Sequence, residues 1–143
     1  MLIGINPLLT PDLLHALAAM GHGDTIVLVD ANYPGTRARR TLDLAGADIV
    51  QALRAILAHL PLDSFVPDPA CVMQVVGEPT AVPPVCAEMN RVLGAHGHKA
   101  AASVERHSFY AAAEAAYAIV RTGERRFYGN ILLTKGVIPP ETA

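Results

Sequence analysis

Cysteine is scarce in this sequence of 143 residues, which contains only Cys71 and Cys86 and no CxxC pair. A small secreted scaffold held by disulfides would contain more cysteine, so we expect the protein to work in the cytoplasm. Long apolar runs are absent as well, and no stretch approaches the roughly 18 residues of a membrane span. The N-terminus has no charged region followed by an apolar one, as a signal peptide would. We therefore expect no membrane partner.

A strong excess of one charge is also missing. The formal net charge is −2 and charged residues make up 17% of the chain, which argues against the basic surface of a nucleic-acid-binding protein. Neither GxGxxG nor the P-loop pattern occurs, so these phosphate-binding fingerprints are excluded. Hydrophobic residues make up 52% of the chain, as in globular proteins. The length fits one domain over residues 1–143.

Hydrophobic periodicity predicts alternating helices and strands. Thr10-Pro11-Asp12 has the N-cap hydroxyl, proline and acid typical of a helix start, and Asp48 is placed to cap a second helix. Thr25–Val29 is apolar and β-branched, as in a strand buried on both faces. The expected helices cover about 11–20, 49–60, 82–95 and a segment from 108, and the expected strands cover 25–29, 42–44, 71–76, 100–105, 117–120 and 131–133, with a loop over 30–39. This alternation predicts a three-layer α/β/α domain around a mostly parallel sheet.

Ligands of such sheets collect at the carboxyl ends of the strands, which makes the polar residues there candidate site residues. Asp30 directly follows the expected strand 25–29, and Arg106 follows the strand ending near 105. The Tyr128-Gly129-Asn130 segment directly precedes a late strand. His22, in the sequence MGHGD, precedes the first strand and belongs to the opposite end. It would reach Asp30 only if a neighbouring subunit or a curled loop brings it there.

Each candidate has a chemical and a purely structural explanation. The imidazole of His22 can donate and accept protons near neutral pH, or it can simply close a helix C-terminus. Asp30 can accept hydrogen bonds from the hydroxyls of a ligand or form an Asx turn. Arg106 can donate a fork of hydrogen bonds or form a surface ion pair. Tyr128 can stack on or hydrogen-bond a ligand or lie at a strand edge, and Asn130 can be a turn residue.

A metal site is not expected. His96 and His98 form an HxH pair, but they lie in a glycine-rich loop without cysteine or clustered carboxylates nearby. The residue pattern by itself therefore indicates an α/β domain with a polar pocket and goes no further.

Two long motifs resemble one family, the L-fucose mutarotase and D-ribose pyranase family (RbsD/FucU). The first is NPLLTPDLLHALAAMGHGDTIVLVDANYP, and the second is RTGERRFYGNILLTKGV near the C-terminus. Between them, RHSFY is similar to the mutarotase branch, which has arginine where the ribose branch usually has histidine. Because the motifs occur in the right order and spacing over nearly the whole chain, they are far more specific than a short triplet.

The resemblance implies an RbsD-like fold with a mostly parallel mixed sheet, and it implies a role for each candidate. His22 would be the general acid/base, and Asp30, Arg106, Tyr128, Gly129 and Asn130 would bind the sugar. The family's members form rings of subunits, often decamers, with sites near the interfaces, so a homo-oligomer is expected. The sequence departs from the mutarotase pattern DAHFP at Asn32 and Tyr33. Asn32 cannot titrate near neutral pH, so any proton relay at that position would be lost.

The activity that the resemblance implies is that of an isomerase which interconverts the α and β anomers of free L-fucose without a cofactor. Two alternatives use the same pocket. A pyranase would interconvert the pyranose and furanose forms of a pentose such as D-ribose. A non-catalytic sugar-binding module would keep Asp30, Arg106 and the YGN segment but would not need a titratable His22. A structural ring protein with a decayed site is disfavoured by the intact motifs.

Overall fold

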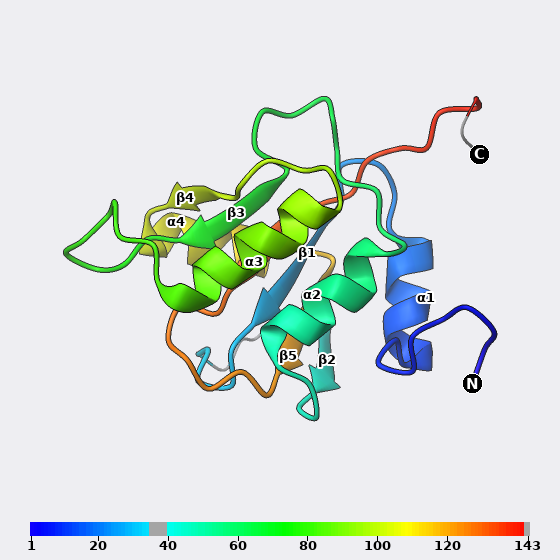
Figure 1. Cartoon of the computed structure of the whole chain (residues 1–143), viewed down its shortest axis with the longest axis horizontal. Helices are drawn as coiled ribbons and strands as arrows, with labels where there is room; N and C mark the ends of the chain where they lie inside the picture. Colours follow the sequence, from blue (N-terminus) through cyan, green and yellow to red (C-terminus); the bar gives the residue numbers. More distant parts are fainter. Residues whose placement is uncertain (35–39, 142–143) are drawn as a thin grey trace.

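Helices and strands alternate along the chain in the computed structural model, which describes residues 1–34 and 40–141 (Figure 1). The elements are α1 (Pro11–Ala19), β1 (Thr25–Val29), β2 (Thr41–Leu44), α2 (Ile49–Leu57), β3 (Ala70–Met73), α3 (Pro84–Ala95), β4 (Ala102–Val104), α4 (Arg106–Glu114), β5 (Ala118–Thr122) and β6 (Ile131–Thr134). Each corresponds to an element expected from the sequence. Within the described ranges, no helix is long and apolar enough to cross a membrane.

The strands form one mixed sheet in the order β2-β5-β1-β6-β3-β4. β5 pairs in parallel with both β1 and β2, and β3 pairs in parallel with β4. β6 runs antiparallel to both of its neighbours, β1 and β3. The expected mostly parallel mixed sheet is therefore confirmed. Since β6 is reversed, its first residues lie at the edge where β1, β3, β4 and β5 end.

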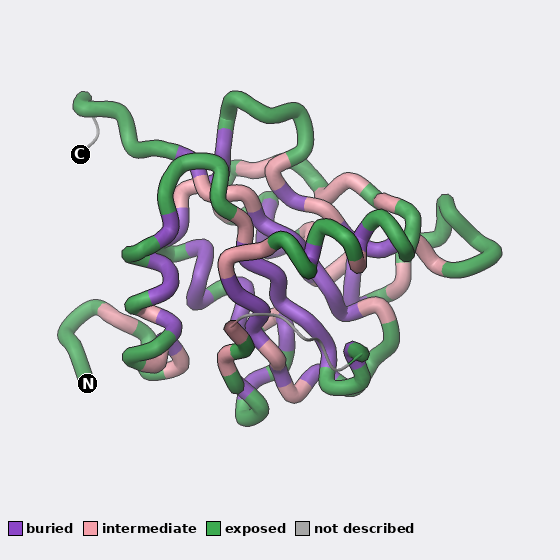
Figure 2. The backbone as a smooth tube through the Cα atoms, turned by 180° about the vertical axis from the view of Figure 1, so that it is seen from behind, coloured by how far each residue is buried: buried purple, intermediate pink, exposed green. Residues whose placement is uncertain are grey.

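Helices cover both faces of the sheet. Along β1, Ile26 and Leu28 point into a core shared with α1, α2 and α3. Val27 and Val29 point to the other face, where they join Phe109 of α4. Figure 1 shows α2 and α3 in front of the strands and α4 behind them, and the strands form the buried centre of the tube in Figure 2. This alternation produces the three layers that were predicted.

The predicted helix starts are present as hydrogen-bonded caps. The hydroxyl of Thr10 accepts a hydrogen bond from the backbone N–H of Leu13 at 3.3 Å. Asp48 and Gln51 form a reciprocal capping box, with distances of 2.8 Å and 3.0 Å. These caps satisfy backbone donors that the first turn of a helix leaves unpaired.

Some boundaries differ from those expected from the sequence. β3 ends at Met73 rather than Val76, because the chain turns at Val75–Glu78 and Gly77 has a φ of +80°. α4 begins at Arg106 rather than near Ser108, because the Glu105 carboxylate caps it by accepting from the backbone N–H groups of His107 and Ser108. The expected loop over 30–39 lies partly outside the described residues, since 35–39 are not described.

Replacing Leu53 tests the core beneath the sheet. Leu53 of α2 is fully buried, so Leu53→Ala should lower the free energy of unfolding by about 2–5 kcal/mol through lost packing and a residual cavity. Urea unfolding followed by circular dichroism measures this change. Leu2→Ala is the matched control because Leu2 is 64% exposed, and it should change stability by less than about 0.5 kcal/mol. Equal losses in both variants would contradict the assigned core.

Candidate functional site

A cavity lies at the edge of the sheet where the parallel strands end. Its volume is about 300 Å³. Four residues expected from the sequence line it: Asp30 after β1, Arg106 at the start of α4, and Tyr128 and Asn130 before β6. The topology explains this gathering, because the reversed strand β6 begins where β1 and β4 end. Residues as far apart in the sequence as Asp30 and Asn130 therefore face one cavity.

The carboxylate of Asp30 is a buried charged group of this cavity, with only 5% of the residue exposed. Its Oδ1 accepts a hydrogen bond from the backbone N–H of Asn32 at 2.9 Å, which is the Asx turn considered from the sequence. The backbone N–H of Asp30 donates to Oδ1 of Asn130 at 3.0 Å. Burial raises the pKa of Asp30, and the hydrogen bonds from the Asn32 backbone and the Asn130 side chain oppose this shift. The Asx turn is thus present, and the binding role of Asp30 stays a prediction.

The segment before β6 has an unusual backbone. Tyr128 has a φ of +65°, and it is the one residue other than glycine with a positive φ among 1–34 and 40–141. Its hydroxyl accepts a hydrogen bond from the backbone N–H of Val76 at 3.2 Å. Asn130 is 4% exposed, which is unlike an ordinary turn residue. Gly129, between them, is not among the residues that line the cavity, and a Cβ on it would come within 2.7 Å of Cγ of Glu124.

Several aromatic and apolar cavity residues were not singled out from the sequence. The rings of Tyr33 and Tyr110 meet edge to face with 5.6 Å between their centroids. Met73, Val76 and Phe127 add an apolar wall. Burial raises the pKa of the Tyr33 phenol, so this hydroxyl is protonated at neutral pH. A sequence signal existed for Tyr110, which lies four residues after Arg106 and hence on the same face of α4.

His22 lies at the other edge of the sheet. It precedes β1, whereas Asp30 follows it, and the strand between Thr25 and Asp30 spans about 17 Å. The helix-closing role considered for His22 is taken by Lys135, whose ammonium donates to the carbonyls of Leu17 and Met20 at 2.7 Å and 2.6 Å. The His22 side chain is 46% exposed. No curled loop brings it to the cavity within the described chain.

Asp63 is the partner that the structure gives to His22. Nε2 of the histidine lies 3.1 Å from Oδ1 of Asp63, and the imidazole packs at 5.6 Å from the ring of Phe65. Asp63 is only 3% exposed, and its backbone N–H donates to the carbonyl of Thr134 in β6. The hydrogen bond from the backbone N–H of Phe65 lowers the pKa of Asp63, and the bond to His22 adds to this shift. Sequence reasoning missed Asp63, because nothing in its segment PLD marks a histidine forty-one positions away.

The HxH pair has a local structural role. Nδ1 of His96 lies 3.0 Å from the carbonyl oxygen of Val92, one turn earlier in α3. Burial lowers the pKa of His98, and the neighbouring His96 acts in the same direction. Across the described residues, no group of three His, Cys, Asp or Glu side chains is arranged to hold a metal ion.

Comparison with known proteins places this architecture among its relatives. The model of the RbsD / FucU transport protein family matches residues 3–138. The chain is 43% identical to the human fucose mutarotase, over 94% of this chain and 93% of that protein. The structure of the Streptococcus pneumoniae fucose mutarotase in complex with L-fucose is similar with a TM-score of 0.90 and 39% identity, covering 96% of this chain and 100% of that one.

A more distant structure shares the fold. Bacillus subtilis RbsD, solved in complex with D-ribose, is 20% identical, with a TM-score of 0.78 over 97% of this chain and 100% of that chain. The match of the family model across residues 3–138 and the identity above 40% to a full-length relative lead to one assignment. The chain belongs to the RbsD / FucU transport protein family.

Proposed function

We propose that this protein interconverts the α and β anomers of free L-fucose, and so is an isomerase that acts on a monosaccharide in the cytoplasm. The observation that carries the proposal is the cavity at the strand ends, which combines a buried carboxylate and a buried amide with an apolar, aromatic wall. A sugar ring presents the complementary surface, with hydroxyls around its edge and C–H groups on its faces. The similarity to fucose mutarotases over nearly the whole chain supports L-fucose as the substrate.

The cavity residues have distinct proposed roles in binding. The carboxylate of Asp30 accepts hydrogen bonds from the sugar hydroxyls, and the amide NH2 of Asn130 donates hydrogen bonds to them. Arg106 adds donors at the exposed rim. Tyr128 presents its ring to the cavity, and Gly129 allows the backbone of this segment to approach closely, because any side chain there would clash with Glu124. Residues 1–143 act as one sugar-converting domain that needs no cofactor.

His22 is the proposed general acid/base. It takes the proton from the anomeric hydroxyl O1 while the C1–O5 bond breaks and the electron pair goes to the ring oxygen O5. The imidazolium then protonates O5, which leaves an open-chain aldehyde. Rotation about C1–C2 exposes the other face of the aldehyde, and the same steps in reverse close the ring. A positioned base of this kind contributes about 10²–10⁴-fold, and the reaction has no net redox change.

The proposed chemistry requires more than one subunit. Because His22 and Asp30 lie at opposite edges of the sheet, one chain cannot bring both to the same sugar. We propose that a neighbouring copy supplies His22 to the cavity, with its imidazole held by Asp63 and Phe65. A head-to-tail contact of this type repeats from copy to copy and closes into a ring, in agreement with the decamer expected from the family resemblance.

The first prediction concerns catalysis. His22→Ala should abolish most of the protein-dependent exchange between the α and β anomers of L-fucose and leave sugar binding partly intact, since Asp30 and Asn130 remain. NMR exchange spectroscopy on the anomeric protons measures the rate, and the wild-type protein is the reference. Undiminished exchange in the variant would remove His22 from the mechanism. Exchange of D-ribose but not of L-fucose by the wild type would reassign the substrate.

A second prediction concerns the shared site. His22→Ala and Asp30→Ala subunits should each assemble into inactive rings. When they are unfolded together in equal amounts and refolded, about a quarter of the interfaces combine an intact cavity with an intact histidine. Exchange should therefore return to about a quarter of the wild-type rate. If both groups acted within one chain, mixing would restore nothing, and a mixture of rings that are not unfolded is the control.

A third prediction concerns Asp63. Its pKa is lowered from the ordinary value of 3.8, so its stabilising contribution is complete above that value and is lost as the pH falls through the folded pKa. Asp63→Asn should thus be less stable than wild type at pH 6, and the difference should shrink below about pH 3.8. Exchange at pH 7 should also fall several-fold, because the imidazole loses its anchor. Urea unfolding across pH and NMR exchange measure the two effects, and a difference in stability that grows toward low pH would contradict the assignment.

A further inference from the structure

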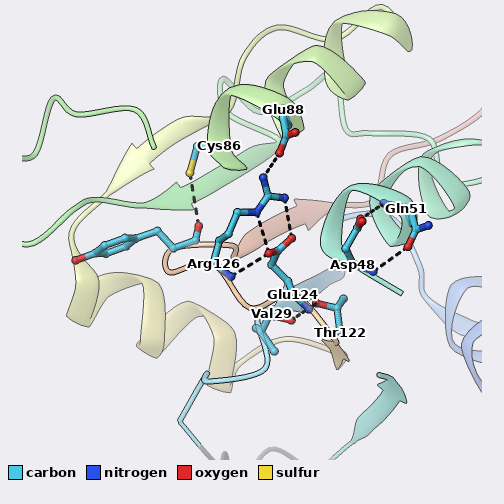
Figure 3. A network of polar contacts seen from close by, with 9 residues as sticks. Val29, Asp48, Gln51, Cys86, Glu88, Thr122, Glu124 and Arg126 are labelled. Carbon is cyan, nitrogen blue, oxygen red and sulfur yellow. Dashed lines mark hydrogen bonds and ion pairs between the residues drawn. The ribbon is translucent and has the colours of Figure 1, made fainter. Parts of the chain in front are cut away.

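A buried ionic group lies directly behind the cavity. Glu124 is 4% exposed and does not line the cavity. Its carboxylate accepts from Arg126 at the backbone N–H, Nε and Nη2, each at 2.9 Å. Figure 3 shows the guanidinium of Arg126 held between Glu124 and Glu88 of α3. The side-chain hydrogen bonds of Arg126 lower the pKa of Glu124 to about 2, so the carboxylate is ionised wherever the protein is folded near neutral pH.

The backbone around Glu124 is tied to both sides of Asp30. The carbonyl of Glu124 accepts from the N–H of Ala31 at 2.8 Å. Its N–H donates to the hydroxyl of Thr122 at 3.2 Å, and this hydroxyl donates to the carbonyl of Val29 at 2.8 Å. A shift of Glu124 would therefore move the residues before and after the buried carboxylate of the cavity.

Glu124 also supports the segment that carries Tyr128 and Asn130. Gly129 packs so closely on Cγ of Glu124 that a Cβ would lie 2.7 Å away, and the same Cβ would lie 3.6 Å from Cβ of Asp30. Tyr128 sits in the left-handed region at φ +65°, a conformation that a bulky residue keeps only when its surroundings enforce it. The ion pair between Glu124 and Arg126 closes the short loop that leads into this residue.

We propose that Glu124, held in place by its hydrogen bonds with Arg126, is a positioning residue that sets the geometry of Asp30 and of the Tyr128–Asn130 segment for sugar binding. It touches no sugar atom itself. The inference rests on the proposed function in one respect, that the cavity binds the sugar substrate. Glu88 secures Arg126 from the side of α3, so it acts one step further away.

The kinetic test compares Glu124→Gln and Arg126→Met with the wild-type oligomer, using L-fucose over a range of concentrations. Both variants should raise KM about tenfold and change kcat by less than about threefold, because a displaced cavity weakens binding while His22 is untouched. The double variant should be no worse than the worse single variant, since both changes break the same clamp. Lys99→Met is the control: it breaks an ion pair with Asp68 in which both side chains are exposed, and it should leave KM and kcat unchanged.

A second measurement does not depend on activity. Hydrogen–deuterium exchange by mass spectrometry should show about fivefold faster exchange in Glu124→Gln for peptides covering residues 29–33 and 122–131. Peptides from α1 should exchange as in the wild type. Arg126→Met provides the same test if Glu124→Gln fails to fold, because Arg126 is 44% exposed.

The outcomes separate the two proposals. Suppose that the wild type interconverts the anomers of L-fucose. If the variants then keep the wild-type KM, or if residues 29–33 and 122–131 of Glu124→Gln take up deuterium at the wild-type rate, the positioning role is overturned while the function stands. If the wild type shows no exchange of L-fucose, the proposed substrate fails. In that case the hydrogen–deuterium measurement still tests the role of Glu124. Faster deuterium uptake in Glu124→Gln supports the positioning role, and unchanged uptake overturns it.

Discussion

The buried carboxylate of Asp30 is the group around which the cavity edge of the sheet is organised. Burial disfavours the charged form of this carboxylate, and a hydrogen bond from the backbone N–H of Asn32 opposes that effect. The side-chain oxygen of Asn130 in turn accepts a hydrogen bond from the backbone N–H of Asp30. These contacts require β1 to end beside the start of β6, which only the antiparallel pairing of the two strands provides. The apolar wall and the loop of Tyr128 then lie around the fixed carboxylate of Asp30.

The other half of the proposed chemistry is built with equal care but faces away from the cavity. His22 is anchored by a buried aspartate and an aromatic ring, and Lys135 fixes the end of the helix that precedes it. A histidine held in this way at the opposite edge of the sheet does not reach the cavity of its own chain. Under the proposed function, the edge of one copy would meet the cavity of the next, and catalysis would then depend on assembly.

Much of the fold follows from local signals in the sequence. The apolar segment of β1 and the Asp48 cap were predicted from such signals, whereas the contact of Asp30 with Asn130 depends on the direction of β6. The remaining features depend on tertiary structure. Hydrophobic periodicity does not indicate the direction of a strand, so only the pairing in the structure reveals that β6 is reversed. The contact of His22 with Asp63 joins two segments that share no pattern, and the same holds for the rings of Tyr33 and Tyr110.

The reversed strand β6 joins the two ends of the molecule. Asn130 of the cavity immediately precedes it, and its last residue, Thr134, accepts the backbone hydrogen bond of the aspartate that holds His22. A slip of one residue in its pairing would turn its side chains to the opposite faces. It would displace both Asn130 in the cavity and the contact of Asp63 with His22. The register of a four-residue strand thus fixes the distance between the cavity and His22 within one copy, and in the proposed ring it would also set where each histidine meets the next copy's cavity.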